Sequence, residues 1–184
     1  MPTFNPINDE IFTVSQFFSP KECEAQIQLA EAIGFEEAPV STASGPRMLK
    51  DLRNNTRVMI DDLERASDLW MRIRDYVPPQ IEDWQACGVN ERLRFYRYDI
   101  GQQFDWHTDG YYRRQNGQRS HLTFMIYLNE GFAGGETSIE EVTITPQQGL
   151  ALCFTHHLRH KGQPVDRGRK YVLRTDVMYR RLGT

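Results

Sequence analysis

The order of apolar and polar residues predicts helices in the first half of the chain. One helix should begin after Ser19, whose hydroxyl can cap it, and Glu22 three residues later completes a capping box. Gly34 stands where that helix should end, because glycine readily adopts the backbone conformation that follows a helix. A second helix should run over residues 61–77, since its apolar residues alternate at spacings of three and four up to Pro78.

The second half of the chain has a different pattern, made of short runs rich in β-branched and aromatic residues. Glycines separate these runs and predict turns between them. Many short strands with glycine-rich turns are typical of a sandwich or jelly roll rather than of βαβ units. The predicted strands are residues 92–98, 122–128, 142–145, 150–154 and 171–179.

We therefore expect an α+β, mainly β fold, with residues 1–90 as helical support and residues 91–182 as the β core of one folding unit. The 184-residue length suits a single domain. The chain has no targeting peptide at its start and no apolar run of about 18 residues, so we expect a soluble, cytoplasmic protein without membrane association. The 3 cysteines lack Cys-x-x-Cys spacing, which argues against a disulfide framework and for a reducing compartment.

Charge is distributed unevenly, although the formal net charge is only −3. Among residues 1–50 most of the charged side chains are acidic, whereas residues 150–184 carry 8 basic and 2 acidic side chains. A basic tail can form a nucleic-acid surface, but the negative overall charge opposes nonspecific affinity for DNA. We therefore favour a positively charged cleft wall that faces a small anion.

His107 and Asp109 are the first candidates for chemistry. On a strand they project to the same side, because side chains alternate with a period of two. An imidazole and a carboxylate placed in this way can take two neighbouring coordination positions on one metal ion. Two histidines and one carboxylate with open positions are typical of non-haem Fe(II) oxygenases, although zinc remains possible on ligand type alone.

A third ligand has to come from elsewhere in the chain, and position alone does not choose it. One histidine precedes a predicted strand and is too near in sequence to reach back comfortably, whereas three follow the apolar strand at residues 150–154. The candidates, in order, are His121, His156, His157 and His160.

The segment after the last of these histidines reads His160-x-x-x-Pro164-Val165-x-x-Gly168-x-Lys170-Tyr171. It resembles the last signature of the prolyl 4-hydroxylase group of Fe(II)/2-oxoglutarate-dependent dioxygenases. Earlier segments are similar to the other motifs of that group and follow in the same order, whereas the helical first half is similar only loosely. These segments are Tyr98 to Asp109, Thr123 to Asn129, Gly134-Gly135-Glu136-Thr137 and Pro146 to Leu152.

The resemblance implies a double-stranded β-helix, or jelly roll, in which His107, Asp109 and His160 hold Fe(II) and form the catalytic centre. It also implies 2-oxoglutarate as the cosubstrate, O2 as the oxidant and ascorbate as a candidate reductant. In the pattern of the group, Lys170 binds the distal carboxylate of 2-oxoglutarate. A dianionic keto acid inside a barrel needs such a fixed cation, because an unpaired buried charge costs several kcal/mol.

Two tyrosines and an arginine complete the implied cofactor site. Tyr127 would donate a hydrogen bond to the distal carboxylate, and Tyr98 would line the cosubstrate or substrate side of the iron. Arg174 and Asp176 depart from the pattern of the group, which often carries a small or apolar residue and an aromatic there. They either form a mutual salt bridge, or Arg174 meets the 1-carboxylate of 2-oxoglutarate or an anionic group of the substrate.

Two polar segments are candidates for positions beside the site. Residues 111–119 follow the metal-binding motif directly and form either a mobile lid or a solvated excursion, and we favour the lid. Residues 53–57 read as a polar loop or edge strand that could flank the cleft.

The expected function is hydroxylation of an unactivated C–H bond with O2, giving succinate and CO2. The substrate would be a peptidyl proline, another protein side chain, or a free amino acid or other metabolite, and the protein a monomer or homodimer. One alternative is an oxidative demethylase of alkylated nucleic acid, which the net charge and the lack of an aromatic base-stacking cluster oppose. Another is a non-catalytic jelly-roll binding module, which would have no need of the ligand set and Lys170 together.

Overall fold

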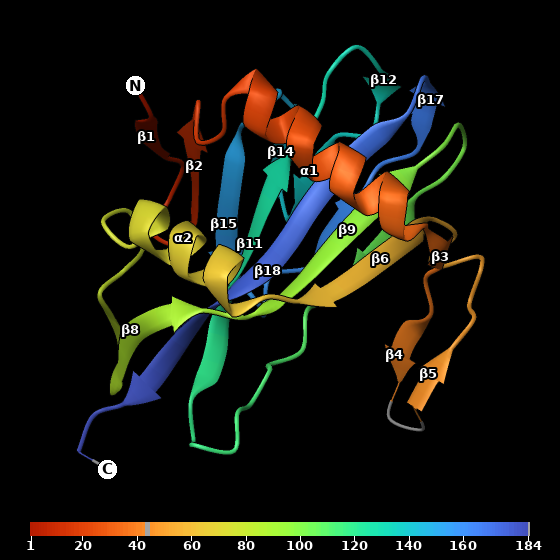
Figure 1. Cartoon of the computed structure of the whole chain (residues 1–184). Helices are drawn as coiled ribbons and strands as arrows, with labels where there is room; N and C mark the ends of the chain where they lie inside the picture. The colour runs from red at the N-terminus through yellow and green to blue at the C-terminus, as the bar shows by residue number, and fades with distance from the viewer. Residues whose placement is uncertain (43–44, 184) are drawn as a thin grey trace.

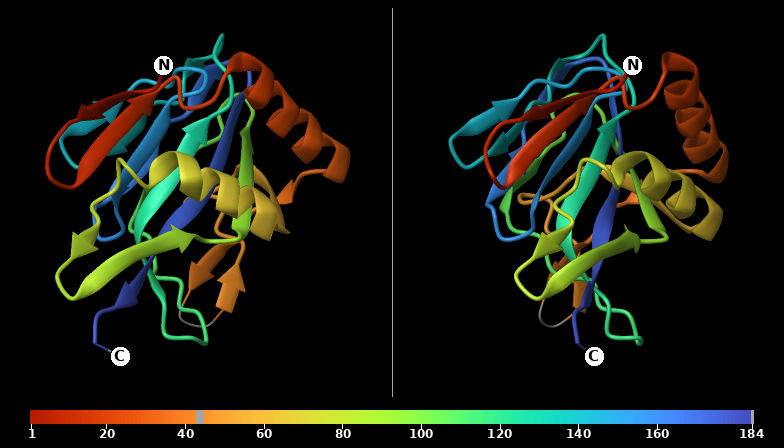
Figure 2. Two further views of the ribbon diagram at one scale, coloured as in Figure 1. Left: turned by 60° about the vertical axis from the view of Figure 1, so that its left-hand side comes forward. Right: turned by 90° about the vertical axis from the view of Figure 1, so that its left-hand side faces the viewer.

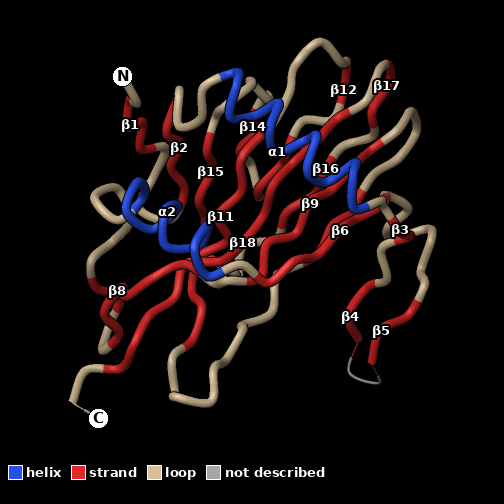
Figure 3. Tube along the Cα trace, in the orientation of Figure 1, coloured by secondary structure: helices blue, strands red, loops and turns tan. Residues whose placement is uncertain are grey.

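The computed structural model describes residues 1–42 and 45–183, and its two main elements are antiparallel sheets. The strands of the larger sheet follow the spatial order β1-β2-β15-β11-β18-β9-β6-β3, and β8 with β7 extends it beside β18. Figure 3 shows these strands and the two helices that cross them. The larger sheet consists of β1 (Thr3–Pro6), β2 (Ile11–Ser15), β3 (Glu36–Glu37), β6 (Thr56–Asp61), β7 (Gln80–Ile81), β8 (Trp84–Val89), β9 (Arg92–Tyr98), β11 (Arg119–Tyr127), β15 (Ala151–Thr155) and β18 (Lys170–Arg181).

The smaller sheet has the order β10-β16-β13-β14, and there are two further short strand pairs. Its strands are β10 (Phe104–His107), β13 (Thr137–Ile139), β14 (Val142–Ile144) and β16 (His160–Gly162). The short pairs are β4 (Val40–Thr42) with β5 (Gly45–Arg47) and β12 (Ala133–Gly134) with β17 (Val165–Arg167). This architecture confirms the expected α+β, mainly β fold.

The first helix, α1 (Pro20–Ile33), begins and ends where the sequence predicts. The Ser19 hydroxyl accepts a hydrogen bond from the Glu22 amide, the Glu22 carboxylate accepts one from the Ser19 amide, and Gly34 is the C-cap. The second helix, α2 (Leu63–Ile73), is capped by Asp62 and is shorter than predicted, because the chain leaves the helical path after Ile73.

The early end of α2 has a local cause. The amides of Tyr76 and Val77 both donate to the carbonyl of Ile73, so the chain turns there. Val77 still packs in the core with 4% of its surface exposed, which explains why the apolar spacing continues past the helix. The residue before Pro78 is also disfavoured in the helical region, because the proline ring clashes with its backbone.

The expectation that the first half consists of helices and loops is wrong. The segments β1, β2, β6 and β8 are strands of the larger sheet. Their sequences carry weak signals for this, since Ile11–Ser15 is a short apolar run of the kind that also occurs in buried helices. In β6, Val58 and Ile60 pack in the helix-covered core, whereas Arg57 and Met59 alternate with them on the other face.

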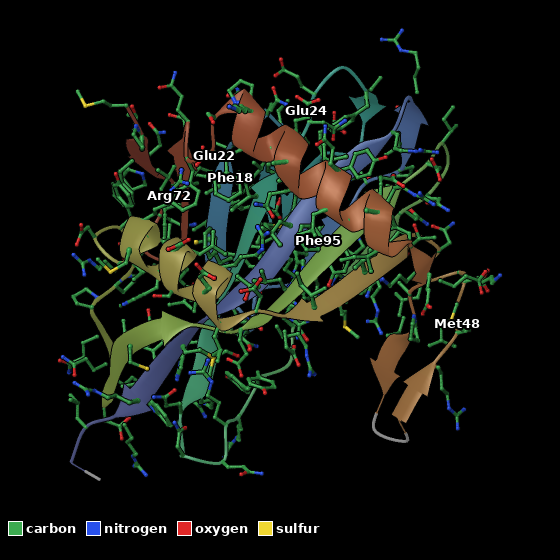
Figure 4. All side chains as sticks on the ribbon, viewed as in Figure 1. Phe18, Glu22, Glu24, Met48, Arg72 and Phe95 are labelled. Atoms are coloured by element: carbon green, nitrogen blue, oxygen red, sulfur yellow. The ribbon has the colours of Figure 1, made fainter. Side chains whose placement is uncertain are left out.

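Both helices cover one face of the larger sheet, and the smaller sheet lies against the other (Figures 1 and 2). Phe95 of β9 points toward the helices in Figure 4, and it is buried with Leu93 in the core that they share. Arg72 of α2 joins the two helices by an ion pair of 2.6 Å with Glu22, and it also donates to the carbonyl of Phe17.

A second core fills the space between the two sheets. On β9, Tyr96 and Tyr98 alternate with the helix-facing residues and therefore enter this second core, where Tyr127 of β11 is also buried. The side chains that carry the candidate chemistry come from the same faces of the strands, so the layer between the sheets houses the site.

The cysteines are free, and burial raises the pKa of each thiol. The pKa of Cys23 rises to about 11, and those of Cys87 and Cys153 also rise. Among the described residues, neither helix is long and apolar enough to cross a membrane.

Candidate active site

His107, Asp109 and His160 come together between the sheets. His107 ends β10, His160 begins β16, and the two residues face each other in the register of that strand pair. Asp109 follows β10, and its carboxylate oxygens lie 3.4 Å from the Nε2 of His160 and 4.0 Å from the Nε2 of His107. One potential ligand atom from each residue lies within 4.8 Å of the others, a spacing that suits a shared metal ion.

Each histidine is held by its outer ring nitrogen. The Nδ1 of His107 lies 2.7 Å from the carbonyl of Asp105, and the Nδ1 of His160 lies 3.0 Å from the carbonyl of Leu158. A carbonyl can only accept, so each Nδ1 carries the proton and each Nε2 presents a lone pair to the cluster. Burial lowers the pKa of His107 to about 4 and also lowers that of His160, so both rings are neutral and able to bind a metal at pH 7.

Asp109 is held in its ionised form by two neighbours. Its Oδ2 accepts a hydrogen bond of 2.5 Å from the Thr123 hydroxyl and lies 2.9 Å from the Arg174 guanidinium. Burial alone would raise the pKa of Asp109, but the nearby positive charge of Arg174 and the hydrogen bond from Thr123 hold it well below its ordinary value. Oδ2 therefore already interacts with two protein donors, Thr123 and Arg174.

Lys170 lies deeper between the sheets and forms no ion pair in the described part of the chain, although the charge of Glu136 acts on it from beyond ion-pair distance. Only 2% of its surface is exposed, and its Nζ donates to the carbonyl of Gly135 at 2.6 Å. The rings of Tyr98 and Tyr127 lie 5.1 and 5.4 Å from the ammonium nitrogen. Burial lowers the pKa of Lys170 to about 7. A cation buried with a carbonyl and two aromatic rings still needs an anion to offset its charge.

The Gly-Gly-Glu-Thr corner brings the chain this close to the lysine. Gly135 has a φ of +71°, and a Cβ there would lie 3.1 Å from the Cδ of Lys170. At Gly134 a Cβ would lie only 2.4 Å from the carbonyl oxygen of Pro164. Glycine is therefore required at both positions by conformation and by space.

A narrow cavity of about 50 Å³ connects the lysine to the cluster. Its walls include Tyr98, Thr137 and Lys170 together with the three residues of the cluster. Tyr127 lies behind this wall, and its hydroxyl donates to the Thr137 hydroxyl at 2.7 Å. Tyr127 would therefore have to give up its hydrogen bond to Thr137 in order to donate to a cosubstrate, as predicted.

Arg174 forms the predicted ion pair with Asp176, with 3.1 Å between the charged atoms. The sequence analysis missed its second contact, with Asp109, because alternation along one strand says nothing about a residue in a distant loop. Asp176 also pairs with Arg94 at 3.2 Å and accepts from the Asn90 amide at 3.0 Å. A role for Arg174 toward the 1-carboxylate of 2-oxoglutarate stays a prediction.

The other candidate histidines lie outside the cluster. His156 is buried behind it, with Nδ1 3.0 Å from the Thr123 hydroxyl and Nε2 2.8 Å from the Ser120 hydroxyl. His156 thus contacts the Thr123 hydroxyl that donates to Asp109. The sequence gives no signal for this role. His157 pairs with Glu10 on the surface, and His121 packs on an aromatic ring.

An outer cleft of about 650 Å³ opens beside the cluster and shares His107 and Asp109 with the inner cavity. Residues 53–57 border it through Arg53 and Arg57, as predicted. The segment 111–119 contributes only its first two tyrosines to this cleft, and much of the rest lines a separate cavity of about 780 Å³. Its function as a lid stays a prediction.

Comparisons with known proteins agree with this geometry. Residues 93–175 match the sequence model described as the 2OG-Fe(II) oxygenase superfamily. The Arabidopsis thaliana protein "Probable prolyl 4-hydroxylase 4" is 24% identical over 145 residues, which cover 76% of this chain and 47% of the relative. "Probable prolyl 4-hydroxylase 8" of the same plant is 26% identical over 134 residues, covering 68% and 43%. The chain therefore spans less than half the length of these relatives.

Solved structures share the fold. A viral collagen prolyl hydroxylase from Paramecium Bursaria Chlorella virus-1, in a 2OG complex, superposes with a TM-score of 0.65 at 21% identity, covering 93% of this chain and 97% of that one. A Trichoplax adhaerens prolyl hydroxylase in complex with a hypoxia inducible factor peptide fragment gives a TM-score of 0.69 at 16% identity, covering 92% and 84%. The expected double-stranded β-helix is confirmed by these likenesses.

Proposed function

We propose that this chain, a member of the 2OG-Fe(II) oxygenase superfamily with the fold of its prolyl hydroxylase-like group, hydroxylates an unactivated C–H bond of an amino-acid-type substrate. One observation carries the proposal. A His-Asp-His cluster and a buried lysine that forms no ion pair in the described ranges line the same cavity. The cluster suits Fe(II) and the lysine suits one end of a dicarboxylic acid.

The donor set fits iron. Two neutral imidazoles and one carboxylate leave coordination positions open, which suits non-haem Fe(II) better than a closed structural zinc site. His107, Asp109 and His160 would hold the metal. When bound, iron and 2-oxoglutarate would supply the oxidising chemistry, in which O2 is consumed, the keto acid becomes succinate and CO2, and one oxygen atom enters the substrate C–H bond.

The remaining residues position the reactants and exclude water. Lys170 would bind the distal carboxylate of 2-oxoglutarate, with Tyr98 as a wall of the cavity. Arg174 and Thr123 hold the carboxylate of Asp109 in one orientation. No general base is needed for this chemistry, so the absence of a Ser-His-Asp arrangement at the described cluster agrees with the proposal.

A peptidyl proline or another amino-acid-type substrate is supported by the names of the relatives, which are prolyl hydroxylases. We also propose ascorbate as the reductant that keeps the metal in the Fe(II) form during turnover. Addition of ascorbate should then prolong the time over which succinate accumulates.

Succinate formation tests the function directly. The purified protein with Fe(II), 2-oxoglutarate and O2 should release succinate slowly on its own and faster with a substrate, which gains 16 mass units as one oxygen atom. Chelation of the metal should stop both reactions. Binding of 2-oxoglutarate without any succinate, under these conditions, would instead support a non-catalytic binding module.

The affinity for 2-oxoglutarate should fall as the pH rises above about 7. Burial lowers the pKa of Lys170 to about 7 in the free protein, whereas a bound carboxylate would stabilise the ammonium and raise that pKa. Binding above pH 7 therefore requires uptake of a proton, and the Kd should rise up to about tenfold per pH unit. The charged and titratable groups around Lys170 are Glu136, Tyr98 and Tyr127, and the pKa values of both tyrosines are raised, so these rings remain neutral.

Calorimetric titration of the Mn(II)-loaded protein checks this expectation at pH 6.5, 7.5 and 8.5. Two buffers with different ionisation enthalpies would report the proton taken up at each pH. A Kd that stays constant over this range, without proton uptake, would contradict the assignment of Lys170 as the carboxylate ligand.

A further inference from the structure

The outer cleft beside the cluster is strongly basic. Four arginines line it but only two aspartates do, and these aspartates are Asp109 and Asp176. The arginines come from three strands and one loop, because alternation places one face of each strand toward the cleft. They are Arg53, Arg57, Arg94 and Arg174.

Two of the arginines are already neutralised. Arg94 and Arg174 face each other across β9 and β18, where like charges would repel, and Asp176 lies between them. The carboxylate is 3.2 Å from one guanidinium and 3.1 Å from the other. Arg174 also pairs with Asp109. Both aspartates of the cleft are therefore occupied.

Arg53 is buried without an acidic partner in the described chain. Only 4% of its surface is exposed, and its guanidinium lies 4.6 Å from the ring centre of Tyr96 and 4.4 Å from that of Phe104. Its Nε donates to the side-chain oxygen of Asn55 at 2.7 Å, but its Nη2 is buried with no hydrogen-bond partner. An unsatisfied buried donor is costly and marks a position that a ligand can complete.

Arg57 is the fourth arginine of the cleft and is half-buried on β6. It forms no ion pair with any acidic residue in the two described ranges. Burial and the neighbouring charges of Arg53 and Arg94 lower its pKa, as expected for a cation among cations. Arg53 and Arg57 therefore carry positive charges that no acidic side chain among the described residues of the cleft neutralises by an ion pair.

We infer that the substrate presents a carboxylate to Arg53 and Arg57, beside the C–H bond that is hydroxylated. This inference rests on the proposed function and names the substrate class of the same site. The rings of Tyr96 and Phe104 and the amide of Asn55 cover Arg53, so a counter-charge has to arrive from the cleft. The cleft also contains His107 and Asp109, which brings the carboxylate next to the metal cluster.

A carboxylate is the anion that an amino-acid-type substrate carries, and it suits the donors of this cleft. Two guanidinium groups offer planar pairs of donors, which match the two oxygens of a carboxylate. The carboxylate can belong to a free amino acid or to an acidic side chain beside the target residue of a peptide.

Matched pairs of acids and amides test the inference. One arm compares the free amino acids with their carboxamides, and a second compares blocked peptides that contain Glu or Asp with the same peptides that contain Gln or Asn. The readouts are succinate above the level without substrate and a mass gain of 16 in the probe. We expect only the acids to respond, and the responding arm identifies the source of the carboxylate.

Variants connect the response to the cleft. Arg57→Gln should raise the KM of the responding acid by about 10–100-fold, because it removes one charge-assisted contact, whereas kcat at saturation should change far less. Arg57→Lys should recover part of the loss. Arg167→Gln is the control, since it removes the same charge from an exposed position on β17. The melting temperature of each variant should confirm that it is folded.

The outcomes separate the inference from the proposed function. Equal responses to acids and amides, a response to amides alone, no response from either set while basal succinate forms, or an unchanged KM in Arg57→Gln would each overturn the carboxylate assignment. A wild-type protein that neither binds 2-oxoglutarate nor forms basal succinate would overturn the proposed function, and the inference would fall with it.

Discussion

Lys170→Met should weaken 2-oxoglutarate binding by about 10²–10⁴-fold, because removing one partner from a buried ion pair costs roughly 3–5 kcal/mol. The methionine is similar in length and apolar, so the tyrosine rings around it can pack as before. In the free protein the substitution removes a buried cation that donates to the carbonyl of Gly135. The variant should therefore melt at the same temperature as the wild type or higher.

Calorimetry and thermal melting with Mn(II), with and without 2-oxoglutarate, measure both effects. The wild type should gain stability on adding the keto acid, and Lys170→Met should not. The control is Arg169→Gln, because Arg169 is the next residue of the chain but faces outward and pairs with Asp99. Tight binding of 2-oxoglutarate to the methionine variant would rule out this lysine as the carboxylate anchor.

Asp109→Asn should lower the affinity for Mn(II) or Fe(II) by at least about 100-fold, since even residues that merely support metal ligands account for 10–100-fold. The amide keeps the shape of the side chain and an oxygen that can accept from Thr123, but it loses the charge that attracts the metal. Metal-dependent succinate formation should fall to background. Arg174 retains Asp176 as a partner, so the folded structure should survive the change.

Electron paramagnetic resonance of free Mn(II) measures the affinity, and circular dichroism verifies the fold. Asp105→Asn is the matched control, because Asp105 lies on β10 just before Asp109 and pairs with Lys161 outside the cluster. Metal affinity of Asp109→Asn within a factor of about three of the wild type, far from the loss expected of a ligand, would refute the proposed ligand set.

The elements that the sequence predicted well are those governed by local contacts. The limits of α1 follow from Ser19, Glu22 and Gly34, which act within one turn of the helix ends. The central strands β9, β11 and β18 are long, so their pattern is clear. Strands β1 and β2 were missed because both are short, and the pair is joined to the sheet only where β2 pairs with the distant β15.

The candidate site also has a part that follows from local sequence and a part that depends on contacts between distant segments. Alternation placed His107 and Asp109 on one side, but their meeting with His160 depends on the pairing of β10 with β16, and only the family resemblance indicated it beforehand. The contact between Arg174 and Asp109 joins β18 to the loop after β10, and periodicity within one strand cannot predict it. The missing partner of Arg53 is likewise a property of the packed cleft and not of its local sequence.

The donors that hold Oδ2 of Asp109 have a consequence for denticity. A carboxylate with both oxygens free can chelate a metal and occupy two sites, whereas this one keeps an oxygen engaged by Thr123 and Arg174. The protein should therefore act as a tridentate ligand through three side chains. A bound metal would then keep its other coordination positions open to exchangeable ligands.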